Sequence, residues 1–261
     1  FGILRGIRPD VVVNSEFNLN SLCGSLFGKL HKRKTLLWSE ATCHSERNYS
    51  RMRKLYRRFL VRLNDGVVAS GLDAKAHLLS LGAPEDSCFV AVDAIEDVKN
   101  RPDYPALEKR AMSVRSETSG AILLYSGQLI ERKGVSNLLN AYQIVSGKHD
   151  VSLFIMGSGP LEKQLKQKVE NDRIRNVHFL GFMNETDKWV YYLASDIFVF
   201  PTKLDVWGLV VNEAMLCGLP VICSKHAGCC SDLIEDGQTG FGVNPHETEE
   251  FADALLKVIA N

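Results

Sequence analysis

Residues 121–160 read AILLYSGQLIERKGVSNLLNAYQIVSGKHDVSLFIMGSGP, and this stretch decides the fold of the chain. Two short apolar runs, at 121–126 and 151–156, are typical of strands that are buried on both faces. Between them, apolar residues recur at helical spacing, at Val135, Leu138, Leu139, Tyr142 and Val145. A strand, a helix and a second strand in this order predict one unit of a parallel α/β sheet.

The same alternation continues to the end of the chain. Further strands are predicted at residues 177–180, 197–201, 220–223 and 240–243. Helices are predicted between them, at about 185–194, at 209–217 as a buried helix, and in a last amphipathic segment from Phe251. Strands that are apolar on both faces and alternate with helices predict a doubly wound, Rossmann-like domain over residues 120–261.

The first part of the chain carries a shorter version of the same pattern. Strands are predicted at residues 10–14, 35–39, 66–70 and 88–92, with the clearest helix running from Arg47 to about Leu63. We therefore expect a second Rossmann-like domain over residues 1–96. We expect it to be incomplete, because no earlier strand carries the glycine-rich turn that usually opens such a domain. A smaller complete domain is the alternative, and residues 97–119, with Pro102 and Pro105, are the predicted linker.

The overall composition is that of an ordinary folded protein. Apolar residues make up 45% of the 261 residues, and 31 Lys and Arg balance 31 Asp and Glu. These values exclude disordered, collagenous and coiled-coil classes, and no apolar run reaches the roughly 18 residues of a spanning helix. The seven cysteines are irregularly spaced, which indicates reduced thiols and a cytoplasmic protein. No metal site is expected, because Cys43 and His44 have no partners at ligand spacing.

Positive charge is concentrated in the first domain. Eleven basic residues lie between Lys29 and Arg62, against only Glu40 and Glu46. For the segment from Arg47 to Arg62 we favour a domain helix that packs its apolar face on the sheet and leaves a basic face in solvent. The open alternative is a helix that contacts the inner face of a membrane. No nucleic-acid partner is expected, because no recognition motif accompanies the charge.

Ligands of open α/β sheets bind beyond the carboxyl ends of the strands, where three loops carry candidate residues. In the first, GQLIERKG at 127–134, Arg132 and Lys133 precede a glycine at a helix start, an arrangement suited to phosphate. A solvated charged turn is its alternative interpretation. The second, GSGP at 157–160, either lets a flat group approach the backbone at Gly157 or only turns the chain into a helix.

The third loop begins the stretch PTKLDVWGLVVNEAMLCGLP at residues 201–220. Asp205 lies just before the predicted helix, and Gly208 leaves the first N–H groups of that helix accessible to an anion. Glu213 lies one turn into an otherwise apolar helix, where a carboxylate needs a partner such as a ligand hydroxyl. The alternative is that Asp205 caps the helix and Glu213 pairs with a cation.

These motifs together resemble the nucleotide-binding domain of glycosyltransferase family 4, the retaining enzymes of the GT-B fold. The family pattern of two acidic residues separated by seven positions reads here as Asp205 and Glu213, followed by AMLCGLPVI. The loop from Gly127 to Gly134 resembles the family's phosphate loop. Downstream, the stretch AGCCSDLIEDGQTGFGV is similar to the sequences that family members have there. The resemblance covers about 140 residues, and the first domain resembles the family's N-terminal domain from its middle onward. By this resemblance the chain lacks the start of that domain and a C-terminal crossing helix.

The resemblance implies a role for each candidate residue in binding a nucleotide diphosphate sugar. Arg132 and Lys133 would bind the diphosphate, Asp205 the sugar hydroxyls and Glu213 the ribose, and these four are the expected catalytic residues. The expected donor-binding residues are Gly127, Gln128, Gly157, Phe182, Met183, Val206, Trp207, Gly208, Leu209 and Val210. In the family's proposed front-face mechanism, the departing phosphate oxygen takes the proton of the acceptor. No metal or other cofactor is then implied.

Three positions depart from the family pattern. Asp205 stands where the family usually has Glu, and Gln128 stands where it usually has Arg. Many members carry a His after the strand predicted at 35–39, where this chain has EATCH at residues 40–44. Neither Glu40 nor His44 is assigned a catalytic role.

The function expected from the sequence is transfer of a sugar, with retention, from a nucleotide diphosphate sugar to a hydroxyl of a glycan or lipid-linked acceptor. Two alternatives stay open: another GT-B enzyme such as a nucleotide-sugar epimerase, and a non-catalytic nucleotide-sugar-binding module.

Overall fold

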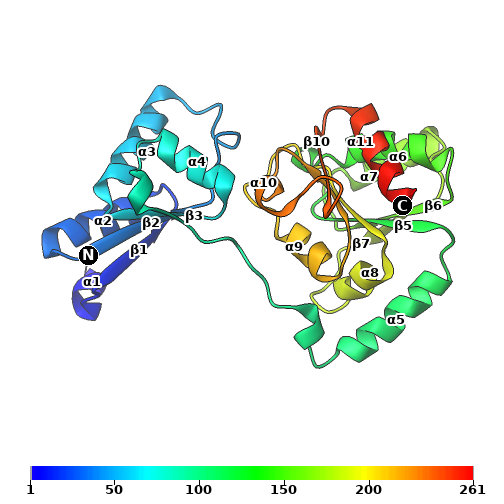
Figure 1. Ribbon diagram of the computed structural model, residues 1–261, viewed down its shortest axis with the longest axis horizontal. Coiled ribbons are helices and arrows are strands. Elements are labelled where there is room, and N and C mark those ends of the chain that lie inside the picture. The colour runs from blue at the N-terminus through cyan, green and yellow to red at the C-terminus, as the bar shows by residue number, and fades with distance from the viewer. Residues whose placement is uncertain (1, 261) are drawn as a thin grey trace. The chain divides into compact units, whose positions relative to one another are not determined.

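A computed structural model describes residues 2–260 of the chain. They form two compact units that divide between Asp93 and Ala94. Each unit contains one parallel sheet with helices packed against it (Figure 1). The expected fold class, two Rossmann-like α/β domains, is confirmed.

The second unit is built on a six-stranded sheet in the order β10-β9-β8-β5-β6-β7, and all of its strand pairs are parallel. Its strands are β5 (Ala121–Ser126), β6 (Val151–Met156), β7 (Val177–Gly181), β8 (Ile197–Phe200), β9 (Val221–Ser224) and β10 (Gly240–Val243). Its helices are α5 (Tyr104–Ser116), α6 (Val135–Ser146), α7 (Glu162–Asn171), α8 (Lys188–Ala194), α9 (Leu209–Leu216), α10 (Cys230–Leu233) and α11 (Thr248–Ile259). Short 3-10 turns lie at Val98–Asn100 and Glu131–Lys133.

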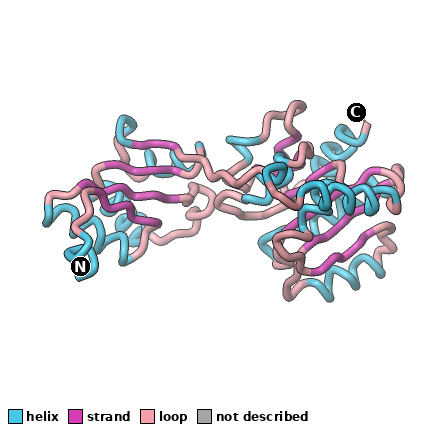
Figure 2. Tube along the Cα trace, turned by 90° about the horizontal axis from the view of Figure 1, so that it is seen from below, coloured by secondary structure: helices cyan, strands magenta, loops and turns pink. Residues whose placement is uncertain are grey.

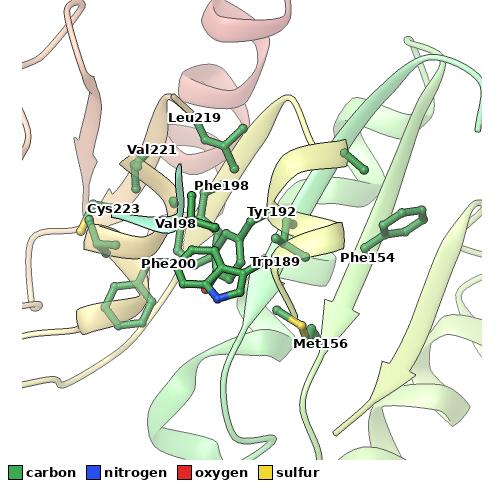
Figure 3. Packing of buried hydrophobic residues seen from close by; sticks show 14 of the residues in the cluster. Val98, Phe154, Met156, Trp189, Tyr192, Phe198, Phe200, Leu219, Val221 and Cys223 are labelled. Atoms are coloured by element: carbon green, nitrogen blue, oxygen red, sulfur yellow. The ribbon is translucent and has the colours of Figure 1, made fainter. Parts of the chain in front are cut away.

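Two hydrophobic clusters cover the two faces of this sheet. Residues of α6, α7 and α11 pack on one face, and residues of α5, α8 and α9 pack on the other. Figure 3 shows the second cluster. In it, the ring of Tyr192 of α8 lies between Trp189 of α8 and Phe198 of β8, with its centroid 5.6 Å from that of each neighbour. Because helices cover both faces, every residue of the internal strand β6, which lies between β5 and β7, is buried, as its largely apolar sequence predicts.

The predicted linker at residues 97–119 differs from what the structure contains. This stretch includes α5, which packs against α8 and buries Leu107 and Ala111 in the second unit. Pro105 lies in the first turn of α5, where its missing N–H leaves no helical hydrogen bond unmade. The helix turns only a narrow apolar stripe to the core, so its hydrophobic period is weak in the sequence.

The first unit has a four-stranded parallel sheet in the order β1-β2-β3-β4. Figure 2 shows the strands of each unit side by side, with helices next to them. Its strands are β1 (Val11–Ser15), β2 (Lys34–Ser39), β3 (Gly66–Ala69) and β4 (Cys88–Val90). Its helices are α1 (Gly2–Ile7), α2 (Leu19–His31), α3 (Arg51–Leu63) and α4 (Leu72–Ser80), with a 3-10 turn at Glu85–Ser87. In β1, Val12 and Asn14 are buried beside α2, whereas Val11 and Val13 are 49% and 58% exposed.

Helix α3 agrees only in part with the interpretation that we favoured for the basic segment. Only Leu60 and Val61 of this helix are buried, whereas Met52, Leu55 and Phe59 are 76%, 62% and 51% exposed. Tyr56 and Leu63 pack against the core of the first unit, so the apolar face of α3 is covered in part, and Met52, Leu55 and Phe59 remain exposed. Among residues 2–260, no helix is both long enough and apolar enough to cross a membrane.

Candidate functional site

The candidate site lies where the strand order of the second sheet reverses. After β5, the chain adds β6 and β7 on one side of it, and it then returns to place β8 on the other side. The loops that follow β5 and β8 therefore leave the same edge of the sheet from neighbouring strands, at the position where open α/β sheets bind ligands. The backbone N–H of Lys203 and the hydroxyl of Thr202 both donate to the carbonyl of Arg132, at 2.8 and 3.2 Å, and hold the two loops together.

One glycine in each of these loops is required by its surroundings. Gly134 has a φ of 72°, and a Cβ added there would lie 2.1 Å from the carbonyl oxygen of Pro201. Gly208 has a φ of 112°, and a Cβ there would lie 2.6 Å from the ring of Phe200. A side chain at position 134 would push the two loops apart, and one at position 208 would displace the ring of Phe200 at the end of β8. Both the backbone conformation and the available space therefore require these glycines.

Lys133 and Asp205 form the central contact of the site. The Lys133 Nζ lies 2.5 Å from Asp205 Oδ2, and both side chains are 14% exposed. The guanidinium of Arg132 lies 3.7 Å from the same oxygen and donates to the carbonyl of Leu204 at 2.8 Å. The sequence suggested that Asp205 could instead cap the following helix, but the carboxylate pairs with the two cations, and Gly208 occupies the cap position of α9.

The residues before α9 present backbone to the site rather than large side chains. Leu209 and Val210 begin the helix, where N–H groups have no partner within the helix, and Leu209 is 45% exposed. The indole of Trp207 is only 2% exposed and donates to Asn212 at 3.0 Å, so its ring belongs to the core. Val206, the residue between Asp205 and Trp207 in the chain, is half-buried. The prediction of a buried helix at 209–217 was wrong for most of α9, because only Val211 and Ala214 of this helix are buried.

A cavity of about 310 Å³ adjoins the loop after β5. Its lining residues are Ser126, Gly127, Gln128, Met156, Gly157, Ser158, Phe182, Met183 and Lys188. Gly157 has a φ of 132°, and a Cβ there would lie 1.9 Å from the carbonyl oxygen of Gly127. The two glycines thus form a thin backbone wall, and five of the residues expected to bind the donor line one cavity.

Glu213 pairs with a cation that the sequence interpretation did not identify. Its carboxylate lies 2.7 Å from Nζ of Lys188, and the two side chains are 13% and 15% exposed. Burial alone would lower the pKa of Lys188, but its hydrogen bonds to Glu185 and Glu213 outweigh that effect and raise it. Burial, and then the nearby Glu213 carboxylate, raise the pKa of Tyr192. Lys188 begins α8, a short and largely buried helix whose sequence carries no motif. The only signal in the sequence was that Glu213 needs a partner.

The structure brings together most of the residues expected at the site, but they differ in exposure. Gln128 and Phe182 are exposed at the mouth of the cavity, Phe182 by 80%, whereas Met183 packs partly into the core. The hydroxyl of Tyr125 donates to the carbonyl of Gln128 at 2.9 Å and supports that part of the loop. Burial, and then the charge of Asp205, raise the pKa of Tyr125. Glu40 and His44 lie in the first unit.

The arrangement is suited to an anion with a polar group attached. Two cations and the start of α9 provide positive potential, two carboxylates offer acceptors to hydroxyl groups, and the adjacent cavity has a partly apolar lining. Within residues 2–260, no three His, Cys, Asp or Glu side chains gather in a geometry suited to a metal ion.

Known proteins share both the sequence pattern and the fold. The family described as "Glycosyl transferases group 1" matches residues 108–261. An uncharacterized glycosyltransferase of Methanocaldococcus jannaschii is 28% identical over 183 residues, which cover 68% of this chain and 46% of that protein. A GDP-mannose-dependent monoacylated alpha-(1-6)-phosphatidylinositol monomannoside mannosyltransferase of Corynebacterium glutamicum is 31% identical over 146 residues, or 53% of this chain and 38% of that protein.

A solved structure, Anabaena HepE in complex with UDP, matches 99% of this chain and 71% of that chain, with a TM-score of 0.82 and 20% identity. This likeness identifies the fold as GT-B. The chain spans about half or less of the length of the curated relatives named above. Because the family match covers more than half of its residues, this chain belongs to the glycosyl transferases group 1 family.

Proposed function

We propose that this chain forms part of a retaining glycosyltransferase of family 4, which moves a sugar, of hexosyl type, from a nucleotide diphosphate sugar to an acceptor hydroxyl. One observation carries the proposal. Lys133, Arg132 and Asp205 converge at the reversal point of the second sheet, beside the start of α9 and next to a cavity of about 310 Å³. This combination of paired cations, helix N–H groups and an adjoining cavity is what a nucleoside diphosphate with an attached sugar requires.

The donor would extend from the cavity to the ion pair. Its base would occupy the cavity beside the backbone of Phe182 and Met183, and its ribose would hydrogen-bond Glu213. Its diphosphate would contact Lys133, Arg132 and the first N–H groups of α9, and Asp205 would hold the sugar hydroxyls. The distribution of the residues supports this order, because Lys188 both lines the cavity and pairs with Glu213.

The chemistry follows from the charge that develops during transfer. As the bond between the sugar carbon and the phosphate oxygen breaks, negative charge grows on the diphosphate. Fixed cations and helix N–H groups stabilise that charge without reorganising. The departing phosphate oxygen takes the proton of the acceptor hydroxyl as the new bond forms on the same face of the sugar. Such a mechanism retains the configuration and requires no metal.

The proposed acceptor is a carbohydrate or a lipid-linked saccharide, and we place the protein in the cytoplasm, at the inner face of a membrane. The exposed apolar residues of α3, namely Met52, Leu55 and Phe59, support the membrane contact. Basic side chains surround them on the same helix, a combination that binds anionic lipid surfaces. The mannosyltransferase relative named above has a phosphatidylinositol-linked substrate in its name.

The test is incubation of the protein with a panel of nucleotide diphosphate sugars, with and without sugar or lipid-linked acceptors. Binding is followed by the shift of the melting temperature, and products are followed by chromatography. Transfer with an unchanged anomeric configuration in the product's NMR spectrum would support the proposal. Isomerised donor without transfer would instead indicate an epimerase. Binding without any turnover in the full-length protein would indicate a non-catalytic nucleotide-sugar-binding module.

A further inference from the structure

A second group of reactive side chains lies in the first unit. The Sγ of Cys43 is 3.4 Å from Nδ1 of His77, and the Nε2 of His77 is 3.0 Å from a carboxylate oxygen of Glu46. The other carboxylate oxygen of Glu46 accepts from Nε of Arg57 at 2.5 Å. The four side chains form one continuous chain of hydrogen bonds that links an exposed thiol to a buried ion pair.

The three side chains behind the thiol are held firmly. Glu46 and His77 are 5% and 6% exposed, and the guanidinium of Arg57 lies 4.8 Å from the ring of Phe17 and 4.5 Å from that of Tyr49. Arginine remains charged in proteins, so Glu46 faces a permanent cation on one side and the imidazole on the other. Packing thus fixes the imidazole of His77 with its Nδ1 toward Cys43.

The tautomer of His77 follows from these partners. Glu46, as a carboxylate, can only accept a hydrogen bond, so Nε2 of His77 must donate to it. In the neutral ring, Nδ1 then carries a lone pair, which accepts from the thiol of Cys43. A thiol whose proton already points at an oriented imidazole is the arrangement that activates cysteine nucleophiles.

The loop that carries Cys43 is itself ordered by hydrogen bonds. The backbone N–H of Thr42 donates to the hydroxyl of Ser45 at 2.9 Å, and the N–H of Ser45 donates back to the hydroxyl of Thr42 at 3.1 Å. The N–H of Glu46 also donates to the carbonyl of Thr42, at 3.2 Å. Cys43 is exposed at the tip of this turn, so a small molecule can reach its sulfur.

We propose that Cys43 is a modification site that forms a mixed disulfide with low-molecular-weight disulfides, with His77 as its proton acceptor. The proton of the thiol passes to Nδ1 of His77 as the Cys43 sulfur attacks one sulfur of the small disulfide. The new bond joins Cys43 to that sulfur, the disulfide bond breaks, and the leaving thiolate takes the proton from His77. One thiol is consumed and one is released, so the exchange needs no further oxidant.

The chain contains its own control for this proposal. Of its seven cysteines, all within residues 2–260, only Cys23 and Cys43 are exposed. Lys and Arg residues between positions 29 and 34 separate the two thiols, so they fall on different tryptic peptides. Brief reaction of the folded protein with iodoacetamide at pH 6.5, followed by mass spectrometry, should show Cys43 modified at least about tenfold faster than Cys23. Glutathione disulfide should then form a mixed disulfide first on the Cys43 peptide.

The variant His77→Gln tests the relay directly. Glutamine can still donate a hydrogen bond to Glu46, but it has no ring nitrogen that could accept the proton of Cys43 as Nδ1 of His77 does. The ratio of the iodoacetamide reaction rates of Cys43 and Cys23 should therefore fall to about one. His149→Gln, which makes the same exchange at an exposed position of the second unit, should leave the ratio unchanged. Equal rates for the two thiols in the unaltered protein, or fast Cys43 in folded His77→Gln, would overturn the proposal. The comparison of Cys43 with Cys23 in the unaltered protein can overturn the proposal even where the His77→Gln variant does not fold.

Discussion

The ammonium group of Lys133 lies 2.5 Å from a carboxylate oxygen of Asp205, although 72 positions separate the two residues in the chain. Each is 14% exposed, so the pair is largely withdrawn from water. In the function proposed above, the diphosphate of the donor replaces Asp205 as the partner of Lys133. The carboxylate is then released toward the sugar hydroxyls, so binding of the phosphate and recognition of the sugar are coupled through one contact.

The first prediction concerns the charge of Lys133. Lys133→Ala should weaken nucleoside diphosphate binding by about 1.5–3 kcal/mol, the scale of a hydrogen bond to a charged group. Isothermal calorimetry provides the measurement, and added salt should weaken the unaltered protein more than the variant. Lys225→Ala is the matched control, because Lys225 pairs with Glu250 on the same unit and should not affect affinity. Unchanged affinity in Lys133→Ala would remove this residue from the donor site.

The second prediction separates the roles of the two carboxylates. Asp205→Asn should lower affinity for the nucleotide sugar more than for the bare nucleoside diphosphate, because it removes a sugar contact and also frees Lys133 for the phosphate. Glu213→Gln should weaken both ligands about equally, since both carry the ribose. Competition binding with matched pairs of ligands measures the difference. Equal losses for the two ligands in Asp205→Asn would refute the sugar contact.

The third prediction concerns the pair formed by Lys188 and Glu213. Lys188→Met leaves a nearly buried carboxylate without its cation and should destabilise the second unit by about 2–4 kcal/mol. Glu213→Gln should lower the free energy of unfolding by less, because Lys188 keeps its hydrogen bond to Glu185. The double variant should lose less than the sum of the two single changes in denaturant unfolding. Additive losses would show that the two side chains act independently.

The fourth prediction is a dependence of stability on pH through Asp65. Burial opposes ionisation of this carboxyl group, but the hydrogen bonds from Thr35 and Lys29 outweigh it, so its pKa is lowered in the folded protein. A lowered folded-state pKa stabilises the fold above the unfolded pKa of about 3.9, and this stability is lost as pH falls through the folded value.

Asp65→Asn should therefore destabilise the first unit at pH 7 by about 1 kcal/mol, a value reduced for partial exposure. The difference from the unaltered protein should shrink as the pH falls below about 4. Asp10→Asn is the control, because Asp10 is 93% exposed and pairs only with Arg33 at the surface. Urea unfolding at several pH values checks both variants. A difference that persists at low pH would assign the effect to something other than ionisation.

The fifth prediction concerns membrane contact through α3. The protein should co-sediment with vesicles that contain anionic phospholipid, and much less with neutral vesicles. The double variant Leu55→Asp and Phe59→Asp should weaken this binding by at least about 2 kcal/mol, roughly 30-fold, because two exposed apolar side chains no longer enter the lipid surface. Leu30→Asp changes a side chain of similar exposure on α2 and should have little effect. Equal binding by all three proteins would exclude α3 as the contact.

The order and type of most elements were predictable from the sequence. The four strands of the first unit and the six of the second were each predicted within one or two residues of their observed bounds. Continuous apolar runs such as β6 can only be buried on both faces, and this requirement is local enough to be read along the chain. Gly134, Gly157 and Gly208 each have a positive φ, a local requirement that glycine meets. The contacts that exclude a side chain at Gly134 and Gly157 come from Pro201 and Gly127, which lie far away in the chain.

Contacts between distant residues were decided only by the tertiary structure. The sequence determined that Lys133 and Asp205 stand in loops after strands, but the placement of β8 beside β5 makes them partners. Lys188 could not be identified as the partner of Glu213, because a lysine on a short helix has no local signal that names its ion pair. The hydrophobic pattern predicted α3 as a helix correctly. A helical pattern does not predict which element packs against the apolar face, because that depends on how neighbouring elements are arranged.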